Sequence, residues 1–194
     1  MCGRYYIASE DSDEELRALI ESLNRRDAEK AAQLSLGEMR PGMLLPAVIK
    51  DGAAALKWGF YVGGEKNESG KRSGGRLIIN ARAETAAEKP LFKSAFASAR
   101  CLFPASLYYE WNESKERFAF NDGGRIFYMA GLWRVEDGTP SAVILTRPAI
   151  PEFSAVHDRM PLIIPKGQRR RWLMGDNPDA LLSVELPPLG MARG

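Results

Sequence analysis

A run of apolar segments in the second half of the chain decides the fold. It reads CLFPASLYYEW (101–111), RFAF (117–120), IFYMAGLW (126–133) and SAVILT (141–146). Aromatic and β-branched residues are frequent in these segments, and turn-forming residues separate them, which predicts strands joined by short connections. Because the strands follow one another without regularly spaced helices, an antiparallel sheet or partial barrel is favoured over a βαβ fold.

Upstream of this run, the sequence predicts more strands and one polar loop. MLLPAVI (43–49) and AALKWGFYV (54–62) predict two strands that pair across KDGA (50–53). RLIIN (76–80) predicts a short strand. The intervening GGEKNESGKRSGG (63–75) has no hydrophobic period and predicts a flexible loop.

The clearest helix signal lies near the N-terminus, in SDEELRALIESLNRRDAE (12–29). Ser12 followed by Glu15 predicts a capping box at its start. The apolar residues of this segment fall on one helical face: Leu16, Leu19, Ile20 and Leu23. A second, shorter helix is predicted for KPLFKSAFASA (89–99).

Downstream of the run, helices and one strand are predicted in short succession. PEFSAVH (151–157) predicts a short helix, and MPLIIP (160–165) predicts a strand. GQRRRWLMG (167–175) and NPDALLS (177–183) predict two more short helices. The expected fold is α+β: a single domain over residues 1–194, with a mostly antiparallel, barrel-like β core flanked by short helices.

Composition and charge are those of a soluble globular protein. The chain has 194 residues, 45% of them hydrophobic, and a formal net charge of +2, which neither demands nor excludes a nucleic-acid partner. No run approaches the ~20 apolar residues that span a bilayer, and no signal-peptide core precedes the acidic residues 10–15. Two cysteines make no disulfide framework, so we expect a cytoplasmic location. We also expect a monomer with no membrane partner.

Cys2 directly follows the initiator methionine. It is either an ordinary packing residue or, after removal of Met1, an N-terminal residue with a free α-amine beside its thiol. The amine and the thiol have ordinary pKa values of ~8 and ~8.5, so both can be tuned into reactive forms near neutral pH. Such an aminothiol can attack an acyl group or bind an aldehyde as a thiazolidine.

Three further residues are candidates for proton transfer or substrate orientation, and each has a structural alternative. His157, the only histidine, titrates near neutral pH, although a lone histidine is more often a surface or core residue. Glu110, set between aromatic residues, is either an exposed strand carboxylate or a partly buried acid or base with a raised pKa. Asn80 either caps a turn or orients a substrate or oxyanion.

Arginines lie close in sequence to most of these candidates: Arg4, Arg82 and Arg159. Exposed arginines ordinarily confer solubility, but this placement favours an anionic substrate such as a phosphate. Trp111 is expected on the face of its strand opposite to Glu110, where it is either a core residue or a stacking platform. The chain has no P-loop spacing, no metal-ligand cluster and no nucleophile elbow, so we expect no metal and no cofactor.

Seven stretches, taken in order, resemble the SOS-response-associated peptidase (SRAP) family. They are MCGRY (1–5), PGMLLPAVI (41–49), WGF (58–60), INARAET (79–85), FKSAFASARCLFPASLYYEW (92–111), MAGLW (129–133) and VHDRMPLII (156–164). The resemblance runs from residue 2 to about residue 173, and the ordered set is far more specific than any one stretch. The closing segment VELPPLGMARG (184–194) departs from the closing strand of the family.

The resemblance implies a single-domain α+β fold with a barrel-like core that binds single-stranded DNA and reacts covalently with abasic sites. After Met1 is removed by self-processing, Cys2 would form a thiazolidine with the ring-opened sugar aldehyde. The family's other catalytic positions correspond to Asn80, Glu110 and His157. Its DNA-binding positions correspond to the backbone-contacting Arg4, Arg82 and Arg159 and the base-stacking Trp111.

Two other classes of function remain open from the sequence. An N-terminal-nucleophile hydrolase or peptidase, such as a glutamine amidotransferase, also begins Met-Cys-Gly, but the chain is short for the usual fold of that class. A non-covalent single-stranded DNA-binding module would carry Cys2 only as a structural residue. Mixing the protein with abasic DNA separates these classes, since only the SRAP-like reaction gives a stable adduct that needs Cys2.

Overall fold

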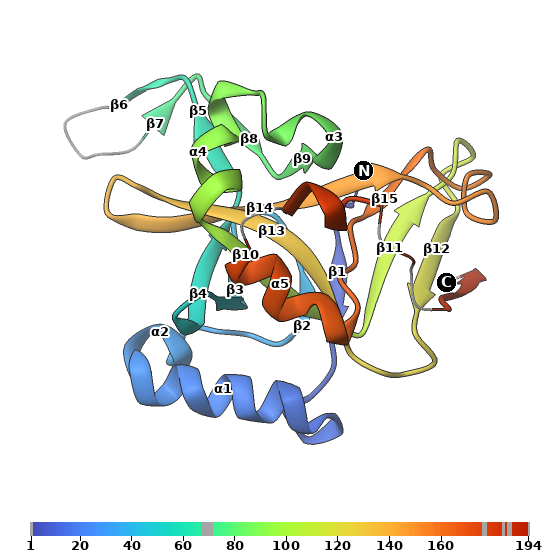
Figure 1. Cartoon of the computed structure of the whole chain (residues 1–194), viewed down its shortest axis with the longest axis horizontal. Helices are drawn as coiled ribbons and strands as arrows, with labels where there is room; N and C mark the ends of the chain where they lie inside the picture. The colour runs from blue at the N-terminus through green and yellow to red at the C-terminus, as the bar shows by residue number, and fades with distance from the viewer. Residues whose placement is uncertain (1, 67–71, 176–177, 184, 186–187, 194) are drawn as a thin grey trace.

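A closed five-stranded β barrel forms the centre of the computed structural model, which describes residues 2–66, 72–175, 178–183, 185 and 188–193 (Figure 1). The barrel strands are β3 (Leu44–Ile49), β4 (Gly52–Trp58), β10 (Arg100–Ala105), β13 (Phe127–Glu136) and β14 (Thr139–Pro148). Their order around the barrel is β13, β10, β3, β4 and β14, and β14 pairs again with β13 to close it. The pairings are antiparallel except that β4 and β14 run parallel.

A second sheet holds the N-terminal strand and packs against the barrel. Its strands are β1 (Tyr5–Ile7), β2 (Gly37–Met39), β11 (Leu107–Trp111), β12 (Arg117–Asn121) and β16 (Gly190–Arg193). They lie in the order β16, β12, β11, β1 and β2. Ser106 alone separates β10 from β11, and its N–H donates a 2.8 Å hydrogen bond to the Tyr6 carbonyl oxygen. The chain therefore turns directly from the barrel into the second sheet.

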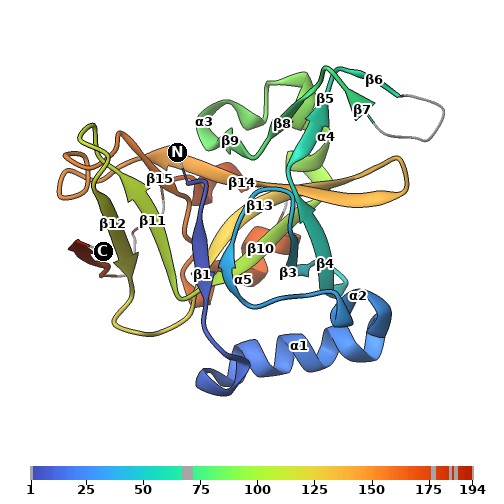
Figure 2. The same ribbon diagram turned by 180° about the vertical axis from the view of Figure 1, so that it is seen from behind.

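Two short two-stranded sheets flank the barrel, and two further short strands pair with its strand β14. β5 (Phe60–Val62) pairs with β8 (Arg76–Ile78), and β6 (Glu65–Lys66) pairs with β7 (Arg72–Ser73). β9 (Asn80–Arg82) runs parallel to β14, and β15 (Arg159–Pro161) runs antiparallel to it. Figures 1 and 2 place the N-terminal end of the chain beside β14 and β15. The start of the chain thus lies close to β15, which carries Arg159, and to β14, which pairs with the strand that carries Asn80 and Arg82.

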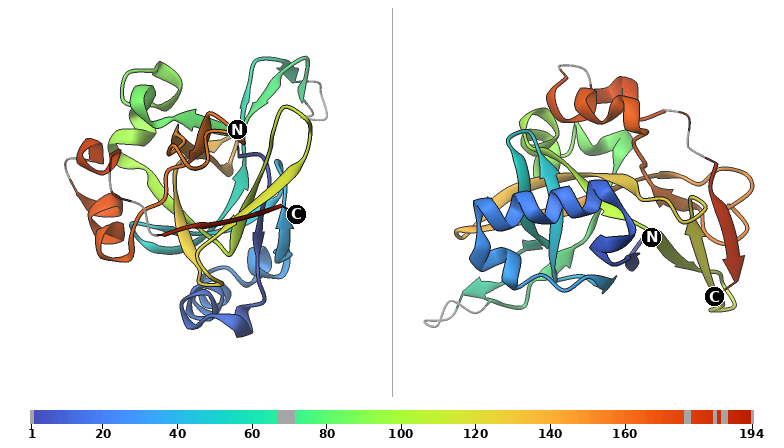
Figure 3. Two further views of the ribbon diagram at one scale, coloured as in Figure 1. Left: turned by 90° about the vertical axis from the view of Figure 1, so that its right-hand side faces the viewer. Right: turned by 90° about the horizontal axis from the view of Figure 1, so that it is seen from below.

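Short helices cover the outside of the sheets. They are α1 (Glu14–Arg26), α2 (Ala28–Ala32), α3 (Ala83–Ala86), α4 (Pro90–Ser98) and α5 (Arg169–Met174), with single 3-10 turns at Glu10–Ser12, Lys166–Gln168 and Pro178–Leu181. α1 lies across β3 and β4, as the right-hand view of Figure 3 shows, whereas α5 packs against β10. No helix in the described part of the chain has the length and apolar character to cross a membrane.

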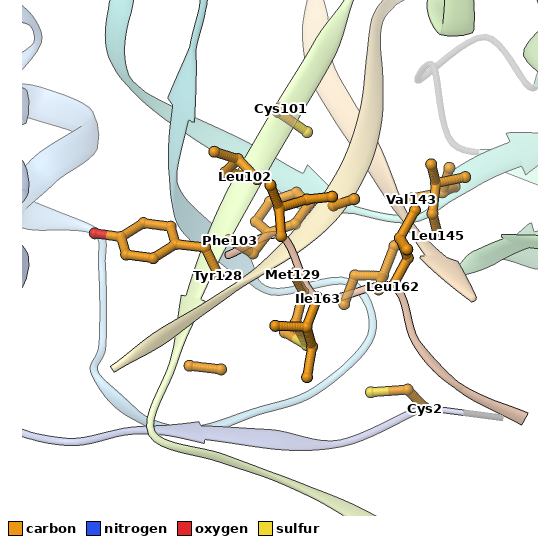
Figure 4. Packing of buried hydrophobic residues seen from close by; sticks show 14 of the residues in the cluster. Cys2, Cys101, Leu102, Phe103, Tyr128, Met129, Val143, Leu145, Leu162 and Ile163 are labelled. Carbon is orange, nitrogen blue, oxygen red and sulfur yellow. The ribbon is translucent and has the colours of Figure 1, made fainter. Parts of the chain in front are cut away.

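The barrel and the second sheet share one hydrophobic core (Figure 4). Tyr108 of the second sheet stacks on Phe120, with ring centroids 4.7 Å apart, within this shared cluster. Gly131 of β13 has no space for a side chain, because a Cβ would lie 2.9 Å from Cys101 Sγ and 2.8 Å from the Val143 carbonyl oxygen. Even alanine at this position would push β13 away from its neighbours in the barrel.

The α+β class and the barrel-like core are confirmed, but the predicted capping box is wrong. Asp13 caps α1 instead of Ser12, and its carboxylate accepts a 3.0 Å hydrogen bond from the Leu16 N–H. Glu15 does not reach back to the cap, because its carboxylate lies 2.5 Å from Lys166 Nζ and 2.5 Å from an Arg169 nitrogen. The ion pairs with Lys166 and Arg169 hold the Glu15 carboxylate away from the N-terminus of α1, so the local capping contact does not form.

Residues 151–157 form consecutive turns, so the helix predicted there is wrong. The Phe153 N–H donates to the Ile150 carbonyl oxygen at 2.9 Å, and the Val156 N–H donates to Phe153 in the same way at 2.9 Å. The Ser154 hydroxyl donates to the Pro151 carbonyl oxygen at 2.8 Å. A segment this short gains too few helical bonds to form a regular helix. His157 ends this segment, and Asp158 alone separates it from β15.

Other expectations fail in part at strand and helix ends. The segment 63–75 includes β6 and β7 rather than being wholly loop, although residues 67–71 lie outside the described residues. Although the closing segment departs from the closing strand motif of the family, β16 (Gly190–Arg193) forms there and pairs with β12. In 177–183 a 3-10 turn replaces the predicted helix, and Asn177 lies outside the described residues. Gly59, with φ of +120°, interrupts the predicted strand 54–62.

Candidate active site

Two residues separate Cys2 from the start of β1, and Asn80 holds the backbone of Cys2. The Cys2 side chain is fully buried and points toward the part of the core that contains Met129 and Ile163 (Figure 4). Asn80 Nδ2 donates a 2.9 Å hydrogen bond to the Cys2 carbonyl oxygen. Asn80 is itself fixed because β9 pairs with β14, where Asn80 lies opposite Ile144. The fold thus joins two predicted site residues that are 78 positions apart.

Glu110 is buried on the inner face of β11, while Trp111 is half-buried on the outer face, as strand alternation predicts. Burial raises the pKa of Glu110 to about 7, and the negative charge of Asp158 acts in the same direction. Burial also raises the pKa of the Cys2 thiol, and the Glu110 carboxylate adds to this effect. Near neutral pH, Glu110 is therefore able both to donate and to accept a proton.

His157 lines a cavity of about 590 Å³ between the end of β11 and the turns before β15. His157 Nδ1 accepts a 3.0 Å hydrogen bond from the Arg159 N–H and lies 2.8 Å from Asp158 Oδ1. Burial lowers the pKa of His157, although the Asp158 charge opposes this effect. The imidazole is therefore mainly neutral near pH 7.

Arg4 and Trp111 form one pair on the outer face of the second sheet. The Arg4 guanidinium lies over the Trp111 ring, 5.2 Å from its centroid, and Arg4 Nε lies 3.5 Å from Glu38 Oε1. Trp111 also lines the cavity that contains His157. A partly exposed aromatic ring beside a cation is a suitable surface for a nucleobase and its phosphate.

Arg82 and Arg159 differ in how free they are to bind an anion. Arg82 is exposed at the end of β9. The Arg159 side chain is only 10% exposed, and its guanidinium donates to both carboxylate oxygens of Glu84, at 2.6 and 2.9 Å. It also donates to the Thr146 carbonyl oxygen at 2.7 Å. The side of the Arg159 guanidinium that contacts Glu84 can bind a phosphate only if the Glu84 carboxylate moves away.

The sequence interpretation missed residues that surround the predicted set. Glu84 lies within the INARAET stretch and Tyr5 within MCGRY, but nothing in either pattern marks them as partners of Arg159 or Cys2. Within the described ranges, no three His, Cys, Asp or Glu side chains are grouped in a way that could hold a metal ion. The site consists of an N-terminal thiol, an amide, a carboxyl of raised pKa, an imidazole and nearby arginines.

The chain is similar to known proteins over nearly its whole length. The family model described as SOS response associated peptidase (SRAP) matches residues 1–189. Abasic site processing protein YoqW of Bacillus subtilis is 31% identical over 96% of this chain and 87% of its own length. Abasic site processing protein YedK of Escherichia coli is 25% identical over 89% of this chain and 79% of its own length.

Solved structures share the fold. A protein from Bordetella bronchiseptica superposes with a TM-score of 0.73 at 22% identity, covering 100% of this chain and 99% of that one. A protein from Bacteroides thetaiotaomicron gives a TM-score of 0.74 at 18% identity, covering 99% of this chain and 91% of that one. With the family model matching nearly the whole sequence, the chain belongs to the SOS response associated peptidase (SRAP) family.

Proposed function

We propose that this protein processes abasic sites in the DNA damage response by binding them covalently through Cys2. Family membership and the names of the related abasic site processing proteins support the substrate class. The observation that carries the covalent mechanism is the position of Cys2, with its carbonyl oxygen held by Asn80 at 2.9 Å. The Cys2 thiol is also close enough to Glu110 for the carboxylate to affect its pKa.

The first step uses the α-amine that Cys2 gains when Met1 is removed. An abasic sugar exists as a closed hemiacetal in equilibrium with a small amount of aldehyde. Glu110, with a pKa of about 7, donates a proton to the ring oxygen as the ring opens. The amine then attacks the C1′ carbonyl carbon, water leaves, and a Schiff base forms.

The second step closes a thiazolidine ring. Burial raises the pKa of the Cys2 thiol, so Sγ remains protonated until it attacks the C1′ carbon of the Schiff base. The amine therefore reacts before the thiol. As the S–C bond forms, the C=N electron pair moves to nitrogen, which is protonated, and the thiol gives up its proton, so that ring closure neither gains nor loses a proton overall. Every reacting protein group belongs to this chain, and the reaction needs no cofactor.

DNA binding is proposed to use the outer surface around the cavity. Trp111 supports a base by stacking, and Arg4 and Arg82 supply positive charge for the phosphates of a single strand. Arg159 can bind a phosphate in the same way only if the phosphate replaces the Glu84 carboxylate at its guanidinium. His157, on the wall of the same cavity, is placed to transfer protons during formation and reversal of the adduct. We propose that a monomer is sufficient for this activity.

A denaturing gel tests the proposal. The protein is mixed with a single-stranded oligonucleotide that contains one abasic site, and an undamaged oligonucleotide serves as the DNA control. A heat-stable shifted band is expected with abasic DNA alone, and Cys2→Ala should abolish it. An N-terminal-nucleophile hydrolase or a non-covalent DNA-binding module would give no such band with the wild-type protein, and either result would refute the proposal.

A further inference from the structure

Two arginines and two aromatic rings alternate across the outer face of the second sheet. Tyr109 and Trp111 are two residues apart on β11, so both half-buried rings lie on this face, with their centroids 6.4 Å apart. Arg117 of β12 is directly opposite Trp111 in the register, and its guanidinium lies over the Tyr109 ring, 5.0 Å from the centroid. On the β1 side, the Arg4 guanidinium lies 5.2 Å from the Trp111 centroid. These four residues are called the arginine–aromatic row below.

The Tyr109 end of the row is open to solvent. Ala119 is directly opposite Tyr109 on β12, and Ala192 of β16 is directly opposite Ala119. These two side chains are too small to cover the ring, so Tyr109 and Arg117 both stay partly exposed. β11 and β12 also lie at the opposite end of the molecule from α2 and α4 (Figures 1 and 2). The row is therefore accessible to a ligand along the sheet surface.

The positive charge of Arg117 is available to an anion. In the described part of the chain, no carboxylate lies within ion-pair distance of Arg117, whereas Arg4 Nε lies 3.5 Å from Glu38 Oε1. The neighbouring carboxylate of Glu116 is paired with Arg193 instead. An arginine that is not paired with a carboxylate is suited to bind a phosphate oxygen.

The row is continuous with the candidate active site. Trp111 lines the cavity of about 590 Å³ that also contains His157, and the row leads from there across β11 to β12. Rings that alternate with cations match the alternation of bases and phosphates in a nucleic-acid strand. Both an aromatic ring and the plane of a guanidinium can stack on an unpaired base. The shape and charge of the row therefore favour a single strand of DNA as its ligand.

We propose that Tyr109 and Arg117 bind the nucleotides that flank the abasic site on one side, beyond the base that stacks on Trp111. This proposal rests on the proposed function and extends it to the flanking strand. Tyr109 supports the next base by stacking, and Arg117 contacts the phosphate beside that base. The flanking nucleotides must then be unpaired, because the faces of paired bases are covered by their neighbours in the duplex.

Two short oligonucleotides test this proposal. One carries the abasic site at its 5′ end and the other at its 3′ end, so each has flanking nucleotides on one side only. Both contain the tetrahydrofuran analogue of the abasic site, which has no aldehyde and binds without reacting. Fluorescence anisotropy then gives the affinity of each oligonucleotide for the full-length protein at several salt concentrations.

Tyr109→Leu should weaken the binding of one oligonucleotide by at least ~5-fold, the equivalent of ~1 kcal/mol of base stacking, and leave the other unchanged. Tyr109→Phe keeps the ring and should restore most of the affinity that Tyr109→Leu loses. Arg117→Gln should reduce the slope of log affinity against log salt by about 0.7, for the same oligonucleotide only. The thermal unfolding of each variant shows that it is folded.

Arg125→Gln is the matched control. Arg125 is an arginine with a 70% exposed side chain that lies beyond the opposite end of β12 from Arg117. The proposal is overturned if Tyr109→Leu and Arg117→Gln bind both oligonucleotides as Arg125→Gln does, or if they weaken both equally. Failure of the proposed function gives a different result, because wild-type protein would then form no Cys2-dependent adduct with abasic DNA that carries the aldehyde.

Discussion

The side-chain amide of Asn80 donates a hydrogen bond of 2.9 Å to the carbonyl oxygen of Cys2. This bond connects a residue that precedes the second sheet with a strand held by the barrel. It limits the rotation of the Cys2 backbone, which carries the α-amine of the proposed reaction. The position of the amine affects the reaction rate strongly, because displacing a reacting group by only about 1 Å can lower the rate ~10²-fold.

Asn80→Ala should therefore slow adduct formation by about 10-fold to 10²-fold, because the amine loses its fixed orientation. The thiol and the carboxyl remain, so the product should be the same. Initial rates of band formation on a denaturing gel, at saturating abasic oligonucleotide, measure the effect. A wild-type rate in Asn80→Ala would mean that this hydrogen bond does not position the reacting amine.

Glu110 makes the stability of the fold depend on pH. Its folded-state pKa of about 7 lies above the ordinary value of 4.5, so the folded protein binds this proton more tightly than the unfolded chain does. The contribution of the protonated carboxyl to stability is complete below pH 4.5 and is lost as the pH rises through 7. Glu110→Gln removes this dependence, because glutamine does not titrate.

The difference in the free energy of unfolding between Glu110→Gln and wild type is expected to grow with pH. Between pH 4.5 and pH 8, the free energy of unfolding of Glu110→Gln should gain on wild type by up to ~3 kcal/mol, at ~1.4 kcal/mol per unit of pKa shift. Urea unfolding at several pH values measures it, and the same variant should form adduct more slowly. A constant difference between the two proteins across this range would contradict the assigned pKa.

The sequence predicted most strands well, and the one pairing that it predicted, between 43–49 and 54–62, is confirmed by β3 and β4. Segments rich in aromatic and β-branched residues, such as 126–133, became strands because burial on both sides rewards such residues. The pairing of β14 with four other strands has no local signal, since it depends on closing the barrel. The helix predicted at 151–157 failed because turns and the link to β15 satisfy its backbone instead.

For the candidate site too, the sequence indicated the residue types but not the contacts between residues that are distant in sequence. Residue types alone selected Cys2, Glu110 and His157, because few side chains supply such chemistry near neutral pH. Strand alternation predicted that Glu110 and Trp111 face opposite ways, but it left open which of the two is buried. The pairing of Arg159 with Glu84, 75 positions away, could not be predicted, because sequence pattern does not show which opposite charge lies nearby in space.

His157 is predicted to matter more for reversal of the adduct than for its formation. A neutral imidazole near pH 7 can accept a proton and return it to the sugar as the ring reopens. His157→Ala should reduce the rate of reversal by about 10²-fold or more and the rate of formation by less. Adduct decay after addition of excess unlabelled abasic DNA measures reversal. Equal effects on both phases, or none, would contradict this division between His157 and Glu110.

Arg82 is predicted to bind a phosphate. Arg82→Ala should weaken binding to single-stranded DNA of any base sequence and reduce the slope of log affinity against log salt by about 0.7. Fluorescence anisotropy over a range of salt concentrations measures this. Arg25→Ala is the control, because Arg25 is an exposed arginine of α1 on the side of the molecule away from β9 (Figure 1). A reduced slope in Arg25→Ala alone would place the DNA on α1.

The most direct test of the central claim is the mass of the adduct at the N-terminus. After the crosslinked protein is digested with nuclease and trypsin, the modified peptide should be Cys2 to Arg4, without Met1. The mass added to this peptide should equal the mass of the abasic sugar remnant minus one water. Borohydride treatment before digestion should not change this mass, because a closed thiazolidine resists reduction. Cys101→Ala should give the same peptide. A modified residue other than Cys2, or an adduct that retains Met1, would contradict the account.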